Sequence, residues 1–516
     1  MSPSQAYHRP RIALVSLYAL ENNGIRYVAT MLRQAGFEVT EIYFKDWSNN
    51  RFPWPREEEI ASLLSTLVDR NIEVVGFSVR ASAFHRIATT LTRRIHVQLG
   101  LPVIWGGMHP TFLPERSIEQ ADFISLGEVE GSVVEFFERW ARGDHPERTP
   151  GFWARKGTEI IRNPIAAPPG ELDTLPFRDF ASAEYKVHIE GSKVHIGDPY
   201  IQNPEYTLLA SRGCPYWTCT YCSNTVTRPL YHKLARDWRI RSVENIIQEL
   251  EQAKLLNPRI KVVRFDDEVF PMRKEWLTEL AEKWPVRVGL PFEVLVDPRL
   301  VREDRLRLMK KAGLRALCMG IQASERVNHE LYHRYTTNDQ IRRAQANFAK
   351  VGIRSSLQVI WDDPASTEQD KDDLFRLLMD LERPFELYLF GLTIYPRTHL
   401  ARRLLREGRI GPQHVEGEGM HAFEQFRVDL DYPRPPSELR WLALLVLLNK
   451  PFVSRELLWR LYNDERLKRN PRPLVLLAKA ANLANFARVG MGLVLEGELS
   501  LLTVRRWLNL DSMVTM

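Results

Sequence analysis

The first 145 residues alternate short apolar runs with amphipathic segments. In the amphipathic segments, apolar residues recur every three or four positions, as a helix with one buried face requires. Apolar strands that alternate with such helices are typical of a parallel sheet covered on both faces. We therefore expect strands at residues 12–18, 38–44, 73–79, 102–107 and 122–127, and helices at 24–37, 57–71, 83–100 and 129–143.

The pattern changes after residue 145. Residues 146–204 predict a hairpin at 151–164 and a proline-containing linker at 171–180. Residues 205–401 return to strands separated by helix-sized gaps, and from about residue 402 the strand signals stop. Residues 402–516 predict a helical domain with apolar faces and basic flanks, which we expect to pack on the preceding domain and close over its substrate. Contact of these helices with a membrane surface is the alternative, because Lys and Arg attract anionic headgroups.

Composition narrows the possible functions. A chain of 516 residues is long enough for about three domains. Its formal net charge of +6, from 71 basic and 65 acidic residues, is too small to favour nucleic acid as a partner. The apolar stretch at 11–20 is short and is followed by polar residues, so we expect neither a signal peptide nor a membrane span, and we expect a cytoplasmic location.

Polar residues and glycines follow the strands expected in the first domain. Ligands of doubly wound sheets bind at the carboxyl ends of the strands, where glycines let a large ligand approach the backbone. No G-x-G-x-x-G motif follows the first strand, which disfavours a dinucleotide. For any single glycine here, a simple turn is an equally good explanation. The candidate ligand-binding residues at this rim are Asn23, Gly24, Ser78, Gly106, Gly107, His109, Thr111, Gly127 and Glu128.

Three of the four cysteines, Cys214, Cys219 and Cys222, lie within nine positions. They follow an expected strand, in a loop of the kind that carries active sites in barrels. Their clustering does not match a dispersed disulfide framework. A structural zinc site needs four closed ligands, and zinc with Cys318 or a histidine as the fourth ligand is one interpretation. The other is a 4Fe-4S cluster in which three thiolates leave one iron open to a ligand.

The cysteine region resembles the radical S-adenosylmethionine (SAM) superfamily. The usual cysteine spacing of that family is three residues and then two, whereas here it is four and then two. The resemblance implies a 4Fe-4S cluster whose open iron binds SAM, and whose electron cleaves SAM to release a 5'-deoxyadenosyl radical. It also implies an electron donor such as a flavodoxin or ferredoxin.

Segments downstream of the cysteines extend this resemblance. Residues 260–270 and 314–336 match the family closely, whereas 352–374 and 392–404 have drifted, with Asp362 and Arg397 at common glycine positions. The resemblance implies that SAM is bound by Tyr221, Asp266, Asp267, Gln322, Ser324 and Arg334.

The first domain is similar to the cobalamin-binding domain that precedes many radical SAM enzymes. The similarity in order and spacing includes residues 24–39, 74–79, 103–115 and 121–136. It implies that the rim residues of the first domain bind cobalamin. None of the thirteen histidines has an aspartate two positions before it, so the D-x-H-x-x-G motif that supplies an imidazole to cobalt is absent.

The expected fold class is therefore α/β. We expect a doubly wound, Rossmann-like cobalamin domain at 1–145, a hairpin and linker at 146–204, a radical SAM partial (β/α) barrel at 205–401 and a helical domain at 402–516. The expected function is that of a cobalamin-dependent radical SAM methyltransferase acting on an unactivated carbon of a small-molecule, peptide or lipid substrate. One alternative is a ring-forming or oxidative enzyme, like the anaerobic cyclase of chlorophyll synthesis, whose domain order the chain also resembles. A second is a non-catalytic corrinoid-binding or light-sensing protein.

Overall fold

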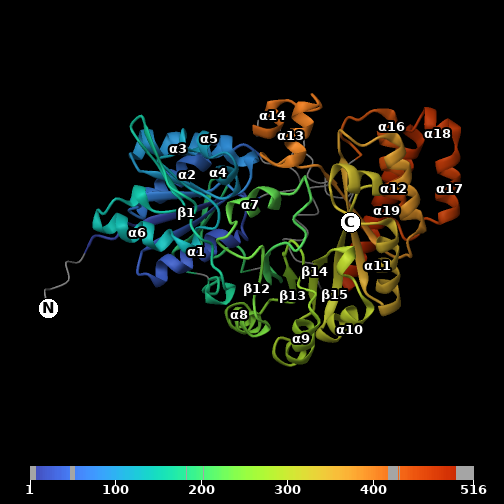
Figure 1. Cartoon of the computed structure of the whole chain (residues 1–516), viewed down its shortest axis with the longest axis horizontal. Coiled ribbons are helices and arrows are strands. Elements are labelled where there is room, and N and C mark those ends of the chain that lie inside the picture. Colours follow the sequence, from blue (N-terminus) through green and yellow to red (C-terminus); the bar gives the residue numbers. More distant parts are fainter. Residues whose placement is uncertain are drawn as a thin grey trace.

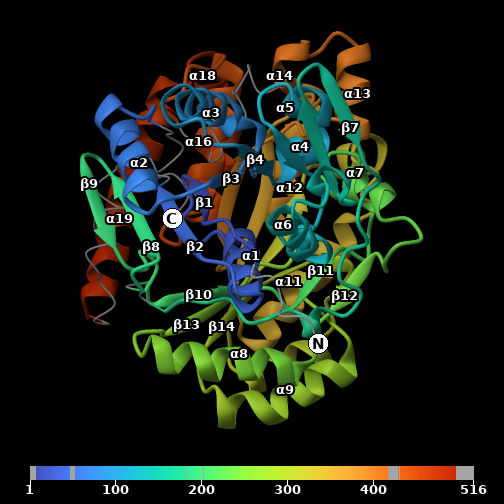
Figure 2. The ribbon, with the colours of Figure 1, turned by 90° about the vertical axis from the view of Figure 1, so that its left-hand side faces the viewer.

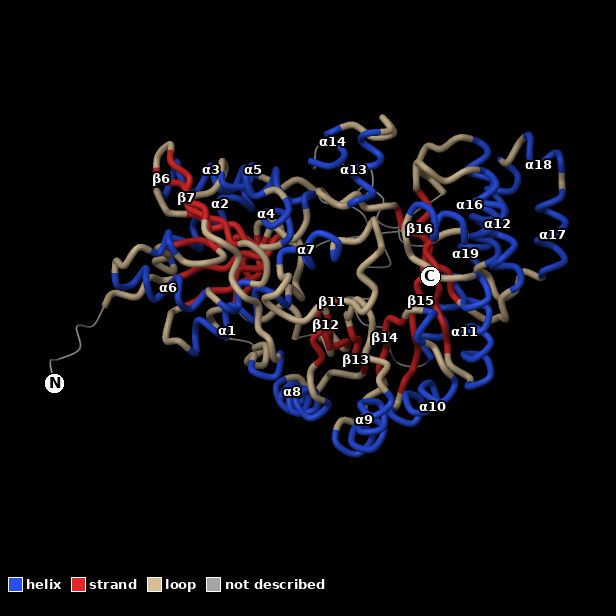
Figure 3. Tube along the Cα trace, in the orientation of Figure 1, coloured by secondary structure: helices blue, strands red, loops and turns tan. Residues whose placement is uncertain are grey.

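The computed structural model describes residues 7–46, 53–181, 183–201, 203–416, 428 and 430–495. Two large sheets dominate the described part of the chain (Figures 1 and 3). The first belongs to the amino-terminal domain, at one end of the molecule. The second belongs to the central domain, and carboxy-terminal helices cover its far side (Figure 1).

The first sheet is doubly wound, as expected. Its five parallel strands pair in the order β5-β4-β3-β1-β2, with helices between them in the sequence. One core packs the sheet against α1 and α6, and a second core packs the opposite face against α2 and α3. The strands are β1 Ile12–Leu17, β2 Val39–Phe44, β3 Val74–Ser78, β4 Val103–Gly106 and β5 Phe123–Ser125, and the helices are α1 Asn23–Gln34, α2 Glu57–Asp69, α3 His85–Leu99, α4 Met108–Phe112, α5 Pro114–Ile118 and α6 Val133–Arg142.

The segment expected as a hairpin and linker lengthens the first sheet at both edges. The expected hairpin is present as β6 Phe152–Lys156 and β7 Glu159–Arg162, and it adds antiparallel strands beside β5. A second hairpin, β8 Lys186–Glu190 and β9 Lys193–Ile196, joins β2 at the other edge. The sequence analysis did not predict this second hairpin, which completes a nine-stranded sheet (Figure 2).

The second sheet consists of six strands that pair in chain order, all parallel. Sequential parallel strands with helices on one side form the partial barrel expected from the sequence. The strands are β10 Glu205–Leu208, β13 Val262–Phe265, β14 Phe292–Val296, β15 Leu314–Gln322, β16 Arg354–Asp362 and β17 Glu386–Gly391, and the helices are α8 Val243–Leu256, α9 Lys274–Arg287, α10 Glu303–Ala312, α11 Asn338–Val351 and α12 Glu368–Asp380.

Between β10 and β13 the chain leaves the second sheet. Residues 211–240 fold as a short antiparallel pair, β11 Ser211–Gly213 and β12 Trp238–Ile240, which encloses the cysteines and α7 Asn224–Leu230. We call this segment the cysteine excursion. The single strand expected before the cysteines is therefore two strands that belong to different sheets.

The carboxy-terminal helices pack on the second domain. Most of α16 is buried in the same core as the second sheet, and the side chain of Asn449 hydrogen-bonds both backbone groups of Leu387 on the edge strand β17. Capping of an edge strand in this way prevents it from pairing with another chain. The helices are α13 His399–Arg406, α14 Pro412–Glu416, α16 Pro436–Leu448, α17 Arg455–Asn463, α18 Glu465–Arg469 and α19 Arg472–Leu495.

Helix α19 exposes Leu476, Leu483 and Met491, and contact of this region with a membrane surface stays a prediction. None of the helices in the described ranges is both long enough and apolar enough to span a bilayer.

Candidate active site

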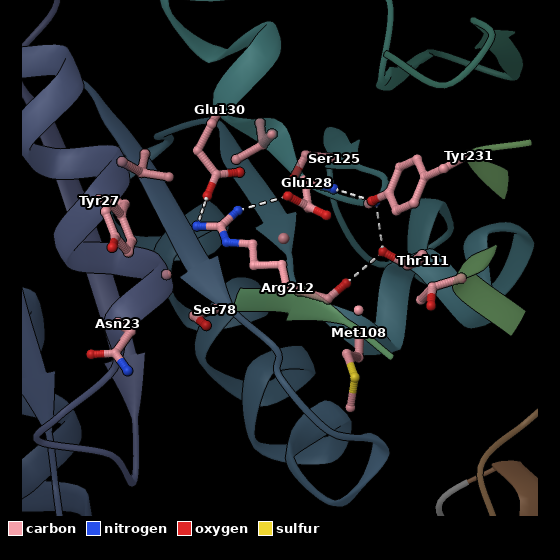
Figure 4. Close-up of a pocket in the computed structure, with 18 of the residues that line it drawn as sticks. Asn23, Tyr27, Ser78, Met108, Thr111, Ser125, Glu128, Glu130, Arg212 and Tyr231 are labelled. Atoms are coloured by element: carbon pink, nitrogen blue, oxygen red, sulfur yellow. Dashed lines mark hydrogen bonds and ion pairs between the residues drawn. The ribbon is translucent and has the colours of Figure 1, made fainter. Parts of the chain in front are cut away.

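A cavity of about 610 Å³ lies between the first domain and the cysteine excursion. Its walls come from the carboxyl ends of the first sheet, from β11 and α7, and from the residues that follow β13. Figure 4 shows side chains from both domains pointing toward one another at this junction. The rim residues and Cys214, which the sequence analysis treated separately, thus line one cavity.

Eight of the nine candidate rim residues line this cavity. The backbone of Gly107 has a φ of +103°, and a Cβ there would lie 2.9 Å from the carbonyl oxygen of Val79. The backbone of Gly127 has a φ of +71°, and a Cβ there would lie 2.3 Å from the hydroxyl of Tyr231. Side chains are therefore excluded at two positions, where a ligand can reach the bare backbone. The eight residues are Asn23, Gly24, Ser78, Gly106, Gly107, Thr111, Gly127 and Glu128.

His109 does not line this cavity, so its assignment as a cobalamin contact stays a prediction that the cavity wall does not support. Successive residues of a helix point about 100° apart, and Met108 and Thr111 take the cavity side of α4. The His109 ring stacks on His85, with ring centroids 5.3 Å apart, and its Nδ1 lies 3.0 Å from the Ser82 hydroxyl. Burial lowers the pKa of His109 to about 3, so this imidazole is neutral at physiological pH.

The cavity continues as an apolar slot between the first sheet and helices α1 and α6. The sequence analysis did not identify this slot, because its residues have the same apolar pattern as the core. Together with the glycine rim, the slot fits a large ligand with a flat apolar part, such as cobalamin. The slot is lined by Leu14, Ile25, Val28, Ile104, Val133, Phe137 and Phe152.

The three clustered cysteines are buried or half-buried free thiols. Burial, together with the neighbouring thiols and Glu268, raises the pKa of Cys214 to about 12. Burial raises the pKa of Cys222 to about 11, and Cys219 and Glu268 add to this effect. Burial also raises the pKa of Cys219, although Arg334 and Arg299 oppose this effect. Buried thiols of this kind need a cationic centre to become thiolates. This donor set fits an iron–sulfur cluster.

Among the described residues, no three Cys, His, Asp or Glu side chains converge on the position of a single metal ion. A cubane cluster does not need such convergence, because each cysteine binds a different iron.

Two aromatic residues in the lengthened cysteine loop, Tyr216 and Trp217, each make their own stabilising contacts. The Tyr216 N–H donates to the Cys214 sulfur at 3.3 Å, and the Tyr216 ring lies under the Arg299 guanidinium at 3.5 Å. Trp217 lines the cavity and lies under Arg228 at 3.7 Å. These cation–π contacts hold both aromatic side chains in place, and so they fix the conformation of the lengthened cysteine loop.

Asp266 and Asp267 line the cavity beside Cys214. The carboxylate of Asp267 accepts hydrogen bonds from the N–H groups of Ala210 and Ser211 and from the Ser211 hydroxyl, so it fixes the start of β11. Burial raises the pKa of Asp267 to about 7. Glu268, which the sequence analysis did not single out, also lines the cavity, and burial raises its pKa to about 7.

Arg334 brings two other candidate SAM residues, Tyr221 and Gln322, together with Cys219 or with Gly320. Arg334 is buried, pairs with Asp297 at 2.8 Å and interacts with both Cys219 and Tyr221. Its Nε is buried without a hydrogen-bond partner in the described part of the chain. The Gln322 amide and the Arg334 guanidinium both pack over Gly320.

Ser324 lies apart from this group. Its hydroxyl donates to Asp370 at 2.8 Å and accepts from the Val327 N–H, so it stabilises the turn after β15.

Two family models match the chain. The model "B12 binding domain" matches residues 11–137, and "Radical SAM superfamily" matches residues 208–378.

Among curated proteins, the chain is similar to the anaerobic magnesium-protoporphyrin IX monomethyl ester cyclase of Rubrivivax gelatinosus, with 22% identity over 69% of this chain and 61% of the cyclase. It is also similar to the uncharacterized methyltransferase PH0819 of Pyrococcus horikoshii, with 22% identity over 64% of this chain and 68% of that protein. The match to the cyclase thus spans about three fifths of that protein's length.

Two solved structures have the same fold over most of the chain. The cobalamin-dependent radical SAM enzyme OxsB covers 98% of this chain and 84% of its own, with a TM-score of 0.65 and 15% identity. The radical SAM methyltransferase TsrM from Kitasatospora setae covers 89% of this chain and 90% of its own, with a TM-score of 0.59 and 17% identity. The chain thus joins a B12-binding domain to a radical SAM domain, and it belongs to the B12-binding radical SAM enzymes.

Proposed function

We propose that this enzyme is a cobalamin-dependent radical SAM methyltransferase that acts on an unactivated carbon. The observation that carries the proposal is the shared cavity, whose wall contains both the bare backbone of Gly107 and the thiol of Cys214. A corrinoid at the rim and a cluster at the cysteines would therefore face each other. When bound, the cluster with SAM supplies radical chemistry, and the corrinoid supplies a transferable methyl group.

The chain's own residues have separate tasks in this proposal. Cys214, Cys219 and Cys222 would hold the cluster. Arg334 would offer its buried, unpartnered Nε to the SAM carboxylate, a charge-assisted bond that is stronger than a neutral one. The apolar slot and the buried cysteine loop would exclude water from the reacting groups.

The substrate is proposed to be a small molecule. TsrM was solved with tryptophan and a SAM analogue, which supports this class for a protein of the same fold. In the present chain, the inner face of the second sheet is half-exposed and polar, with Ser356, Gln358 and Tyr388 on adjacent strands. This face could contact a polar substrate. A flavodoxin-like or ferredoxin-like electron donor is part of the same proposal.

An oxidative or ring-forming reaction is the second candidate. It is favoured by the similarity to magnesium-protoporphyrin cyclases of two organisms, at 22% and 23% identity over 69% of the chain. The two reactions differ in the product, because methylation adds a CH2 unit to the substrate and oxidative ring closure does not.

The deciding experiment uses protein purified without oxygen, with iron, sulfide and corrinoid measured before the assay. We expect SAM and dithionite to yield 5'-deoxyadenosine, and we expect label from methyl-labelled SAM to enter first the corrinoid and then an acceptor from a panel of small molecules. The Cys219→Ala variant is the matched control, since it should form no 5'-deoxyadenosine. A product that is oxidised without label would overturn methyl transfer and favour the second candidate. Bound corrinoid without any SAM cleavage would overturn both.

A further inference from the structure

Glu128 was expected to contact cobalamin, but its carboxylate points to the cysteine excursion. Oε2 of Glu128 pairs with Nη1 of Arg212 at 2.7 Å, and Arg239 binds the same carboxylate. The N–H of Glu128 donates to the hydroxyl of Tyr231 at 2.5 Å. Groups from β11, from β12 and from the end of α7 thus converge on a single residue of the first domain. Figure 4 shows two of them, Arg212 and Tyr231, directed at Glu128.

This contact is a shielded charge network. The side chains of Arg212 and Arg239 are only 15% and 6% exposed, and Arg212 also pairs with Glu130 at 2.8 Å. Burial raises the pKa of Glu128, but Arg212 and Arg239 outweigh burial and hold it below its ordinary range. Removal of one partner from such a network leaves a shielded charge uncompensated, which is unfavourable. The network therefore favours one relative placement of the two domains.

Glu128 has the ligand rim on one side and the cysteine loop on the other. The preceding residue, Gly127, donates its N–H to the Thr111 hydroxyl at 2.9 Å, and both residues line the cavity. On the other side, Arg212 lies on the short strand β11, and Cys214 is the first residue after that strand. The ion pair between Glu128 and Arg212 therefore joins the rim to the residues that lead into Cys214.

We propose that Glu128 is a positioning residue that couples corrinoid binding at the rim to the geometry of the cysteine loop. The inference rests on the proposed placement of the corrinoid in the cavity. Coupling between two sites is reciprocal, so a cluster in the loop strengthens corrinoid binding by the same factor as a corrinoid strengthens cluster binding. We expect a factor of about ten, within the range usual for coupled sites.

The test is a set of hydroxocobalamin titrations on the full chain, with and without a reconstituted cluster. Wild type should bind about tenfold more tightly when the cluster is present, and Glu128→Gln should reduce that ratio to less than about twofold. Glu115→Gln is the matched control. It removes a carboxylate of the same domain that pairs with Arg162 on the exposed surface, so it should keep the wild-type ratio.

Two further measurements separate positioning from a general loss of structure. Cobalamin should change the electron paramagnetic resonance spectrum of the reduced cluster in wild type and in Glu115→Gln, but not in Glu128→Gln. If Glu128 acts through Arg212, the double variant Glu128→Gln/Arg212→Met should lose no more coupling than either single variant.

The possible results distinguish this inference from the proposed function. If wild type binds no corrinoid in either state, the proposed function and the inference both fail. If corrinoid binds but the ratio is the same in wild type and Glu128→Gln, the inference alone is overturned.

Discussion

The two parallel sheets of this molecule bury their side chains in different ways. In β1, the neighbouring residues Leu14 and Val15 point to opposite faces of the first sheet and both enter a hydrophobic core. In β16, Leu357 is fully buried under the helices, whereas the next residue, Gln358, is half-exposed on the inner face. The first sheet is therefore packed on both faces, and the second on only one.

This difference determines where each sheet can bind a ligand. Packing occupies most of both faces of the first sheet, so its ligand-binding residues are found at the strand ends and in the slot beside them. Among the described residues, the inner face of the second sheet is half-exposed. The cysteines of this domain lie on an excursion that leaves the sheet altogether. The site lies where the rim of one sheet meets the excursion from the other.

The largest effect is expected when the cluster site is disabled and the corrinoid site is left intact. Cys219→Ala removes one of three cluster ligands, so we expect loss of cluster iron and of 5'-deoxyadenosine formation, while corrinoid binding survives with at most the proposed loss of coupling. Iron analysis measures the cluster content, and a corrinoid titration on the same preparation measures corrinoid binding.

Cys318→Ala is the control for this comparison. Cys318 lies on β15 of the second sheet, outside the excursion, and its replacement should leave cluster iron unchanged. Metal loss in Cys318→Ala would instead support the zinc site with Cys318 as fourth ligand.

The next effect concerns stability and tests the burial pattern itself. In the first sheet, Ile12→Ala and Val15→Ala lie on opposite faces and should both be costly, at about 2–4 kcal/mol each, because each deletes buried methyl groups. In the second sheet, Leu357→Ala should cost about 2–5 kcal/mol, whereas Gln358→Ala should stay within about 0.5 kcal/mol.

Denaturant unfolding, followed separately for each domain, measures these four values. Equal losses for Leu357→Ala and Gln358→Ala would mean that the inner face is packed as tightly as the outer one, which would contradict the difference between the sheets.

A smaller effect should appear at the rim of the first sheet. Gly127→Ala combines an unfavourable left-handed backbone with a Cβ that meets the Tyr231 hydroxyl, so we expect a loss of about 2–3 kcal/mol in stability. Corrinoid binding should weaken as well, since the rim and the excursion are pushed apart at this point.

Gly143→Ala is the matched control. Gly143 has a similar φ of +66° and no atom within 4 Å of the added Cβ, so this variant pays the backbone strain without the clash. The difference between the two variants isolates the contact with Tyr231. If Gly127→Ala and Gly143→Ala bound corrinoid with equal affinity, the contact between residue 127 and Tyr231 would not contribute to the corrinoid site.

Local pattern was sufficient to predict much of this architecture. The five strands of the first sheet were predictable because both faces are buried, so residues such as Leu14 and Val15 are apolar in succession. The hairpin of β8 and β9 was not predicted, because β9 lies exposed at the sheet edge and alternates Lys and His with its apolar residues.

Long-range contacts could not be predicted from local pattern. Asp267 fixes Ser211 across 56 residues, and Glu128 meets Arg212 across 84. Nothing near Glu128 in the sequence indicates that its partner is an arginine rather than a ligand. The orientation of His109 depends on where a five-residue helix begins, which a resemblance in spacing does not fix.

The smallest effect is a pH dependence that belongs to the first domain. Burial holds the pKa of His109 at about 3 in the folded chain, below the ordinary value of 6.5. The unfolded chain therefore takes up a proton as the pH falls below 6.5 while the folded chain does not, so stability is full above this pH and is lost as the pH falls toward 3. At pH 5.5 the loss of stability should be about 1 kcal/mol relative to pH 7.5.

In His109→Asn the stability of the first domain should no longer depend on pH in this way, as measured by denaturant midpoints at the two pH values. Replacement of the exposed His195 should leave the pH dependence unchanged. A slope that persists in His109→Asn would assign the acid sensitivity of the first domain to other groups.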